Sequence, residues 1–176
     1  MEKDFTISLD GLKAGRSAYE WHADGKFFDG FENSEILDAD IDVVATVEKS
    51  GKYIGVDCQV KGDVTVSCDR CLADLKLPVD TLFRLSVKFG VETGTADEGG
   101  REIVMLPESD SLLDLSQIVY DYVCLDLPMQ RVHEDGGCDP EVVKYLSVSE
   151  DEDMAEVVSE PVDNPFASLK DLLERK

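Results

Sequence analysis

Basic residues are scarce in this sequence. Lysine and arginine together number 17, against 39 aspartates and glutamates, and the formal net charge is −22 at pH 7. A charge of this sign repels phosphate backbones and anionic membrane surfaces, and it attracts basic proteins. The composition therefore argues against binding to DNA or to membranes, and it implies that any contact with RNA is local or indirect.

Long hydrophobic runs are absent as well. The first residues, MEKDFTISLDGLKAG, contain no apolar signal-peptide core, and no stretch approaches the roughly 18 apolar residues of a membrane span. We therefore expect a cytoplasmic protein. Its 176 residues are enough for one main domain with tails but leave little room for two full domains.

Catalytic motifs are missing too. No Walker loop, dinucleotide fingerprint or nucleophile motif occurs in the chain. Of the two histidines, His22 lies in the apparent strand YEWHAD, where an ordinary imidazole at or near the surface is expected. The many carboxylates are interpreted as solvated faces. The sequence thus favours a protein without enzymatic activity.

Cysteine is sparse and odd in number, with five in the chain. Without a signal peptide, this number argues against a disulfide framework and favours reduced thiols, metal ligands or core packing. Cys124 has no partner in the local sequence and is expected to be a small core side chain.

Alternation of apolar and polar residues dominates the first two thirds of the chain. This period of two is typical of strands with one solvated face, so we expect antiparallel pairing. A glycine-rich acidic loop is expected at 90–100, followed by a short strand in REIVML. The alternating residues are Phe5, Ile7, Leu9, Val43, Ala45, Val47, Ile54, Val56, Cys58, Val60, Val64, Val66, Cys68, Leu75, Leu77, Val79, Leu85, Val87 and Phe89.

The spacing becomes helical in LDLSQIVYDYVCLDLP. Asp114 is expected to cap the first turn, with Gln117 answering it as in a capping box, and Pro128 is expected to stop the helix. We therefore predict a helix over 115–127. Its apolar face comprises Leu115, Ile118, Val119 and Tyr122.

The C-terminal part changes composition sharply. EDEDMAEVVSEPVD at 150–163 has seven acids and no lysine or arginine, so 147–163 is expected to be a flexible acidic linker after a main domain of residues 1–146. A short helix over 164–176 follows, capped by Asn164. Such a helix is marginal alone, so its apolar stripe must pack on its own domain or in a partner's groove. The stripe, which is the candidate partner-binding set, comprises Phe166, Leu169, Leu172 and Leu173.

Two short pairs carry metal-ligand spacing. Cys68 and Cys71 form a C-x2-C pair, and His133 and Cys138 form an H-x4-C pair. Together they make a Cys3His set suited to tetrahedral zinc, and glycines at 136–137 would let the second loop turn tightly. The long separation of the pairs leaves two alternatives open, a redox C-x2-C and thiols without a metal.

Several of these motifs, taken in order, resemble the bacterial YceD family. They are CDRC after alternating strands, IVYDYVCLDLP running into VHEDGGC, and the terminal NPFASLKDLL. That family is described as promoting accumulation of large-subunit ribosomal RNA, so the resemblance implies a role in 50S ribosomal subunit biogenesis. Its Cys-x-Arg-Cys and His-x4-Cys motifs match Cys68, Arg70, Cys71, His133 and Cys138, which strengthens the case for a structural zinc ion.

These observations predict an α+β fold, with an antiparallel, strongly bent sheet or partial barrel, a packed helix and a tethered C-terminal helix. The function expected is that of a non-enzymatic factor that binds a ribosomal protein or a pre-50S particle. A zinc- or thiol-dependent enzyme is one alternative. A direct RNA-binding module using Arg70, Lys76 and Arg84 is another, although Arg70 is better explained as a structural cation beside the thiolates.

Overall fold

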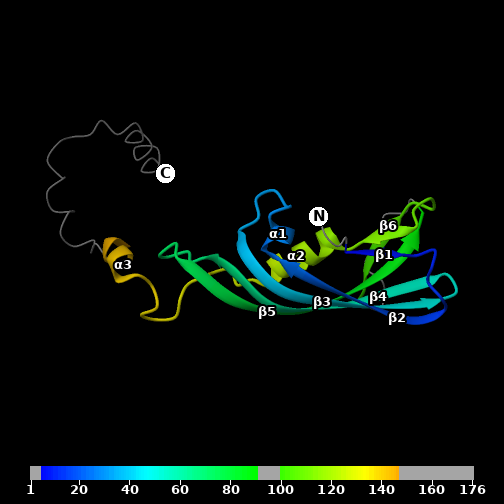
Figure 1. Cartoon of the computed structure of the whole chain (residues 1–176), viewed down its shortest axis with the longest axis horizontal. Coiled ribbons are helices and arrows are strands. Elements are labelled where there is room, and N and C mark those ends of the chain that lie inside the picture. Colours follow the sequence, from blue (N-terminus) through cyan, green and yellow to red (C-terminus); the bar gives the residue numbers. More distant parts are fainter. Residues whose placement is uncertain (1–4, 91–99, 147–176) are drawn as a thin grey trace, which may run out of the picture. The chain divides into compact units, whose positions relative to one another are not determined.

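The computed structural model describes residues 5–90 and 100–146. The chain divides into two compact units, residues 1–139 and 140–176. All described elements except the last belong to the first unit (Figure 1). The predicted linker at 147–163 and the predicted helix at 164–176 lie outside the described residues.

A five-stranded sheet with the order β2-β3-β4-β5-β6 forms the body of the first unit. Its strands are β2 (Gly15–Asp24), β3 (Ile36–Ser50), β4 (Tyr53–Ser67), β5 (Asp74–Phe89) and β6 (Glu102–Leu106). The long strands curve along their length (Figure 1). The α+β class is confirmed, but β2 and β6 are open edges, so closure into a partial barrel is not confirmed.

The first four strands pair antiparallel, as the alternation predicts, but β5 and β6 pair parallel. The expectation of antiparallel pairing is wrong for this last pair. A parallel neighbour needs a crossover connection of about a dozen residues, and the segment 90–101 is long enough to return the chain to the start of β6. The alternation that predicts antiparallel pairing is absent from β6, where the four residues after Glu102 are all of intermediate exposure.

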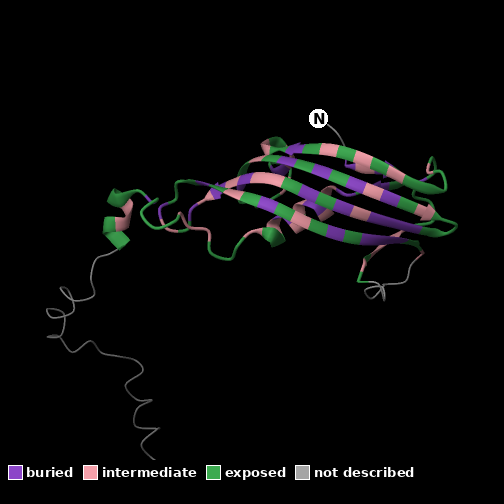
Figure 2. Ribbon diagram, turned by 90° about the horizontal axis from the view of Figure 1, so that it is seen from below, coloured by how far each residue is buried: buried purple, intermediate pink, exposed green. Residues whose placement is uncertain are grey.

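The buried face of the sheet is made by the alternating apolar residues. Val43, Val60 and Phe83 lie on neighbouring strands with little or no exposure. Phe89, the last alternating residue, is exposed at the strand end. The opposite face of the sheet is seen directly in Figure 2, with exposed residues alternating along each strand, and no helix of the described part of the first unit lies over it.

Helix α2 (Ser116–Asp126) lies on the buried face, where Tyr122 stacks on Phe83 of β5 with ring centroids 4.3 Å apart. Asp114 does assist the helix start, since its Oδ1 accepts a hydrogen bond from the Ser116 amide at 2.8 Å. Gln117 does not complete a capping box. Its side chain instead donates to Asp121, one turn further on, at 2.8 Å.

The remaining elements are small. Strands β1 (Thr6–Ser8) and β7 (Leu112–Asp114) form a separate antiparallel pair, and α1 (Gly25–Phe28) follows β2 with Asp24 as its cap. Helix α3 (Pro140–Leu146) begins the second unit and has no counterpart among the expected elements.

Candidate metal centre

The first pair of cysteines lies in the turn between β4 and β5. The turn is closed by the Cys68 amide, which donates to the Ala73 carbonyl at 2.9 Å, and by the Leu72 amide, which donates to the Cys68 carbonyl at 2.9 Å. Leu72 adopts a left-handed conformation with φ of 61°. This turn buries the side chains of both Cys68 and Cys71.

The second pair lies in the segment that leaves α2. This segment runs past the β4–β5 turn, where the Asp69 amide donates a hydrogen bond to the Arg131 carbonyl at 2.7 Å. Arg131 returns the contact, because its amide donates to Asp69 Oδ2 at 2.6 Å. A tight turn follows, with Gly136 at φ of 84° and the Gly137 amide donating to the Glu134 carbonyl at 2.9 Å. This turn returns Cys138 toward His133.

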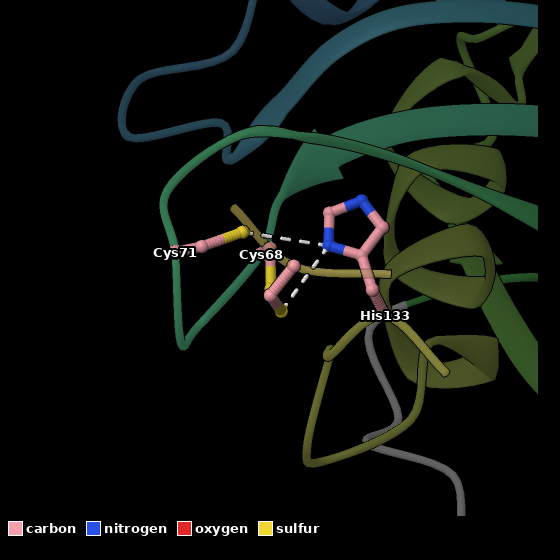
Figure 3. A group of neighbouring side chains, drawn as sticks. Cys68, Cys71 and His133 are labelled. Carbon is pink, nitrogen blue, oxygen red and sulfur yellow. Dashed lines mark hydrogen bonds between the residues drawn. The ribbon is translucent and has the colours of Figure 1, made fainter. Parts of the chain in front are cut away.

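The structure brings the four predicted ligands together. Their donor atoms all lie within 4.8 Å of one another, and Cys68, Cys71 and Cys138 are buried. Cys68 Sγ lies 3.8 Å from Cys138 Sγ. His133 Nδ1 lies 3.5 Å from Cys71 Sγ and 3.7 Å from Cys138 Sγ. Figure 3 shows Cys68, Cys71 and His133 gathered around a common centre.

These distances fit a zinc ion. Tetrahedral bonds of about 2.3 Å to sulfur and about 2.0–2.1 Å to nitrogen would place two ligand sulfurs about 3.8 Å apart and a sulfur and a nitrogen about 3.5 Å apart. The Cys68–Cys138 distance of 3.8 Å matches the sulfur–sulfur value, and the distances of 3.5 and 3.7 Å from His133 Nδ1 to Cys71 and Cys138 lie close to the sulfur–nitrogen value. Three thiols and one imidazole are also a donor set that zinc prefers in closed structural sites.

The imidazole of His133 is oriented for this role. Its Nε2 lies 3.1 Å from the main-chain carbonyl oxygen of Asp74. A carbonyl only accepts hydrogen bonds, so Nε2 carries the proton, and in the neutral ring the lone pair of Nδ1 then faces the sulfurs. A ligand histidine whose second nitrogen donates to a carbonyl is the usual arrangement around bound metals.

Arg70 lies beside the cluster and forms hydrogen bonds with two of its residues. Its Nε donates to Cys138 Sγ at 3.1 Å, and its Nη2 donates to the His133 carbonyl oxygen at 3.2 Å. The hydrogen bond to Cys138, together with the charge of that group, raises the pKa of Arg70. This geometry agrees with a structural cation that screens thiolate charge. The guanidinium forms its hydrogen bonds with residues of the cluster.

The surroundings favour ionised sulfur at two of the cysteines. Burial alone would raise the pKa of Cys68, but backbone amides of Cys71, Arg70 and His133 outweigh it and lower that pKa to about 5. A backbone hydrogen bond at Ala73 likewise lowers the pKa of Cys71. Burial raises the pKa of Cys138 although Arg70 opposes it, and a hydrogen bond to Cys68 raises the pKa of His133. Thiolates are the form that binds metal.

Glu35 and Arg131 lie beside the site but belong to no sequence motif. Arg131 forms an ion pair with Glu35 at 2.6 Å and reaches Asp69 at 3.5 Å. Asp69 lies inside the C-x2-C motif, so its proximity to the cluster is visible in the sequence. Glu35 and Arg131 are 96 positions apart, and no pattern in the sequence connects them.

The other candidate residues lie elsewhere. His22 is exposed on β2, as expected, with Nδ1 3.1 Å from Asp42 and Nε2 3.7 Å from Asp40. Cys124 is only half-buried, so the expectation of a core position is not met. The four ligand candidates are the only such metal-ligating group among residues 5–90 and 100–146.

In this same described part of the chain, no helix is both long and apolar enough to cross a membrane. Comparison with the curated proteins and with the solved structures found no match. Residues 56–173 match a family model described as "Large ribosomal RNA subunit accumulation protein YceD". The matched range contains both pairs of candidate ligands.

Proposed function

Because the chain belongs to the YceD family, which is named for accumulation of large-subunit ribosomal RNA, we propose that it supports this accumulation by binding rather than by catalysis. Its partner in this proposal is a large-subunit ribosomal protein or a precursor particle of the 50S subunit. Contact with ribosomal RNA is indirect and is made through that partner.

The observation that carries the proposal is the charge on the uncovered face of the sheet. Asp40 and Asp42 on β3 lie side by side with 81% and 79% of their side chains exposed. Asp38 is also exposed, at the start of β3. Carboxylates arranged in this way complement a basic protein surface.

Direct binding of RNA has less support, because two of the three basic residues named for it, Arg70 and Lys76, have other partners. Arg70 donates to Cys138 and to the His133 carbonyl oxygen. Lys76 pairs with Asp63 at 3.1 Å. Asp57, which lies opposite Arg84 across the strands, is paired with Arg101 at 2.8 Å. Phosphate binding needs cations that remain available to neutralise the backbone.

The metal centre in this proposal is structural. Zinc held by Cys68, Cys71, His133 and Cys138 would fasten the segment after α2 to the β4–β5 turn. A site with four protein ligands is closed, whereas a catalytic zinc keeps a position open for water or substrate. This comparison favours the binding factor over the zinc enzyme.

The test is a pull-down from cells with the full chain at moderate salt, followed by identification of the bound proteins and RNA. A triple variant, Asp38→Asn, Asp40→Asn and Asp42→Asn, should capture less large-subunit protein or precursor particle. A matched control, Asp10→Asn, Glu108→Gln and Asp110→Asn, removes the same charge from loops and should bind normally. Equal loss in both variants would mean that only net charge matters. Capture of naked ribosomal RNA that depends on lysine and arginine would instead favour the RNA-binding alternative.

A further inference from the structure

Leu72 is an unusual residue for its position. It has φ of 61°, a left-handed conformation that costs most non-glycine residues about 1 kcal/mol or more. Its side chain is also 76% exposed, so burial of apolar surface does not offset this cost. A residue that is both strained and exposed at a turn is a frequent sign of a functional contact.

Leu72 borders one of two hollows that share a wall. The first, of about 290 Å³, is lined by Leu72 and Leu37 beside the turn. The second, of about 430 Å³, is lined by Leu125 and Met129 at the end of α2. Arg131 and Glu35 line both hollows and form the wall between them.

The apolar side chains around these hollows form an exposed group. Leu37 is 53% exposed, Leu125 is 77% exposed, and Met129 is fully exposed. Together with Leu72 they are here called the turn patch. Exposed apolar side chains that gather around hollows mark interaction sites more often than single exposed leucines do.

The rim of the turn patch is acidic. Glu35 keeps 70% of its side chain exposed and Asp69 keeps 38%. The only cation lining either hollow, Arg131, pairs with both of these carboxylates and is only 19% exposed. The acidic end of the uncovered sheet face lies close by, since Ile36 pairs with Val66, two residues before Cys68.

We propose that the turn patch is the docking site for a basic protein segment, which inserts apolar side chains into the two hollows and places lysine or arginine against Glu35 and Asp69. The inference rests on the proposed function, because it names where the ribosomal partner docks. Charge complementarity selects a basic partner, and the apolar hollows provide the anchor. Nucleic acid fits poorly, because its recognition uses aromatic stacking and available cations.

Two residues of the turn patch, Leu72 and Met129, are connected to segments that carry the candidate metal centre. Leu72 directly follows Cys71, and Met129 lies two residues before Arg131, which is hydrogen-bonded to Asp69. In this proposal these connections restrain the patch before the partner arrives, which would lower the entropy cost of binding.

The test uses the full chain and a defined probe, namely the proteins extracted from large ribosomal subunits. Leu72→Asn removes the anchor while keeping a residue that tolerates the left-handed conformation. A second variant, Leu125→Gln with Met129→Gln, alters the other hollow. The control is Leu112→Gln, because Leu112 is 57% exposed on β7. Both patch variants should bind at least about tenfold more weakly, as is common for anchor residues, with the control unchanged.

The possible results distinguish failure of the turn patch from failure of the proposed function. If the unaltered chain captures ribosomal proteins or precursor particles and the patch variants capture them equally well, the turn patch is wrong but the proposed function stands. If the unaltered chain captures neither, the proposed function fails. Binding of deproteinised ribosomal RNA that is lost in the patch variants would overturn the protein partner. A change from dimer to monomer in the patch variants would instead identify a second copy as the occupant.

Discussion

Asp69 and Arg131 are joined through both backbone and side chain. The Asp69 amide donates to the Arg131 carbonyl at 2.7 Å, the Arg131 amide donates to Asp69 Oδ2 at 2.6 Å, and the Arg131 guanidinium lies 3.5 Å from Asp69 Oδ1. This clamp connects the β4–β5 turn to the segment after α2. It joins the two segments that carry the halves of the candidate metal centre.

Asp69→Ala should therefore loosen the metal centre. Loss of the carboxylate leaves the Arg131 amide without its acceptor, and we expect the free energy of unfolding to fall by about 1–3 kcal/mol. Urea denaturation measures this change. Asp69→Asn keeps an acceptor oxygen and should cost less. Equal losses in the two variants would show that charge, rather than the backbone contact, is what Asp69 contributes.

Zinc should bind at one ion per chain through Cys68, Cys71, His133 and Cys138. Elemental analysis of protein purified without chelators, with X-ray absorption to count sulfur and nitrogen ligands, checks this prediction. Cys68→Ser should lower the zinc content and the melting temperature, because metal binding contributes to folding. Cys124→Ser is the control and should retain zinc. Normal zinc content in Cys68→Ser would rule out this ligand set.

Gly62→Ala should destabilise the sheet where β3 and β4 approach closely. A Cβ at Gly62 would overlap the Asp40 carbonyl oxygen and lie 2.7 Å from Ile41 Cα, so the backbone must shift. We expect a loss of about 1–3 kcal/mol or more, measured by denaturant titration. Gly11→Ala places a Cβ in open space and is the matched control. A neutral Gly62→Ala would mean that the strands separate easily here.

Cys58 should make stability fall at alkaline pH. Burial raises the pKa of this thiol from 9.0 to about 12. Below pH 9 the thiol is protonated in both states and adds no pH dependence. Between about pH 9 and 12 only the unfolded chain loses the proton, so the free energy of unfolding decreases.

Stability measurements on the wild-type chain and on Cys58→Ala across this range isolate the effect, because other titrating groups cancel in the difference. The advantage of the wild-type chain should shrink as pH rises. A constant difference would show that the thiol ionises equally in both states.

The stripe of Phe166, Leu169, Leu172 and Leu173 remains a prediction from the sequence, as a tethered arm that binds the ribosomal partner. Leu169→Asp with Leu172→Asp should abolish capture of that partner and leave the melting temperature of the chain nearly unchanged, as expected for a helix that adds little to the core. A loss of roughly 2–5 kcal/mol would instead show that these leucines pack in the chain's own core.

The sequence by itself determined the features that depend on neighbouring residues. Alternation identified the strands because successive side chains point to opposite faces. The C-x2-C and H-x4-C spacings singled out the four candidate ligands that the structure brings together, because each pair lies within one turn. The acidic composition likewise predicted the charge of the uncovered sheet face. None of these features requires knowledge of which distant segments meet.

Tertiary structure alone decided the contacts between distant segments. The ion pair of Glu35 with Arg131, the parallel direction of β6 and the sharing of Glu35 and Arg131 by two hollows depend on strand register and on the path of connecting loops. Many registers and loop paths are compatible with one pattern of alternation, and the packing of the whole core selects among them. The sequence predicted that the four candidate ligands meet, but it predicted neither their separations nor the contacts between Asp69 and Arg131 beside them.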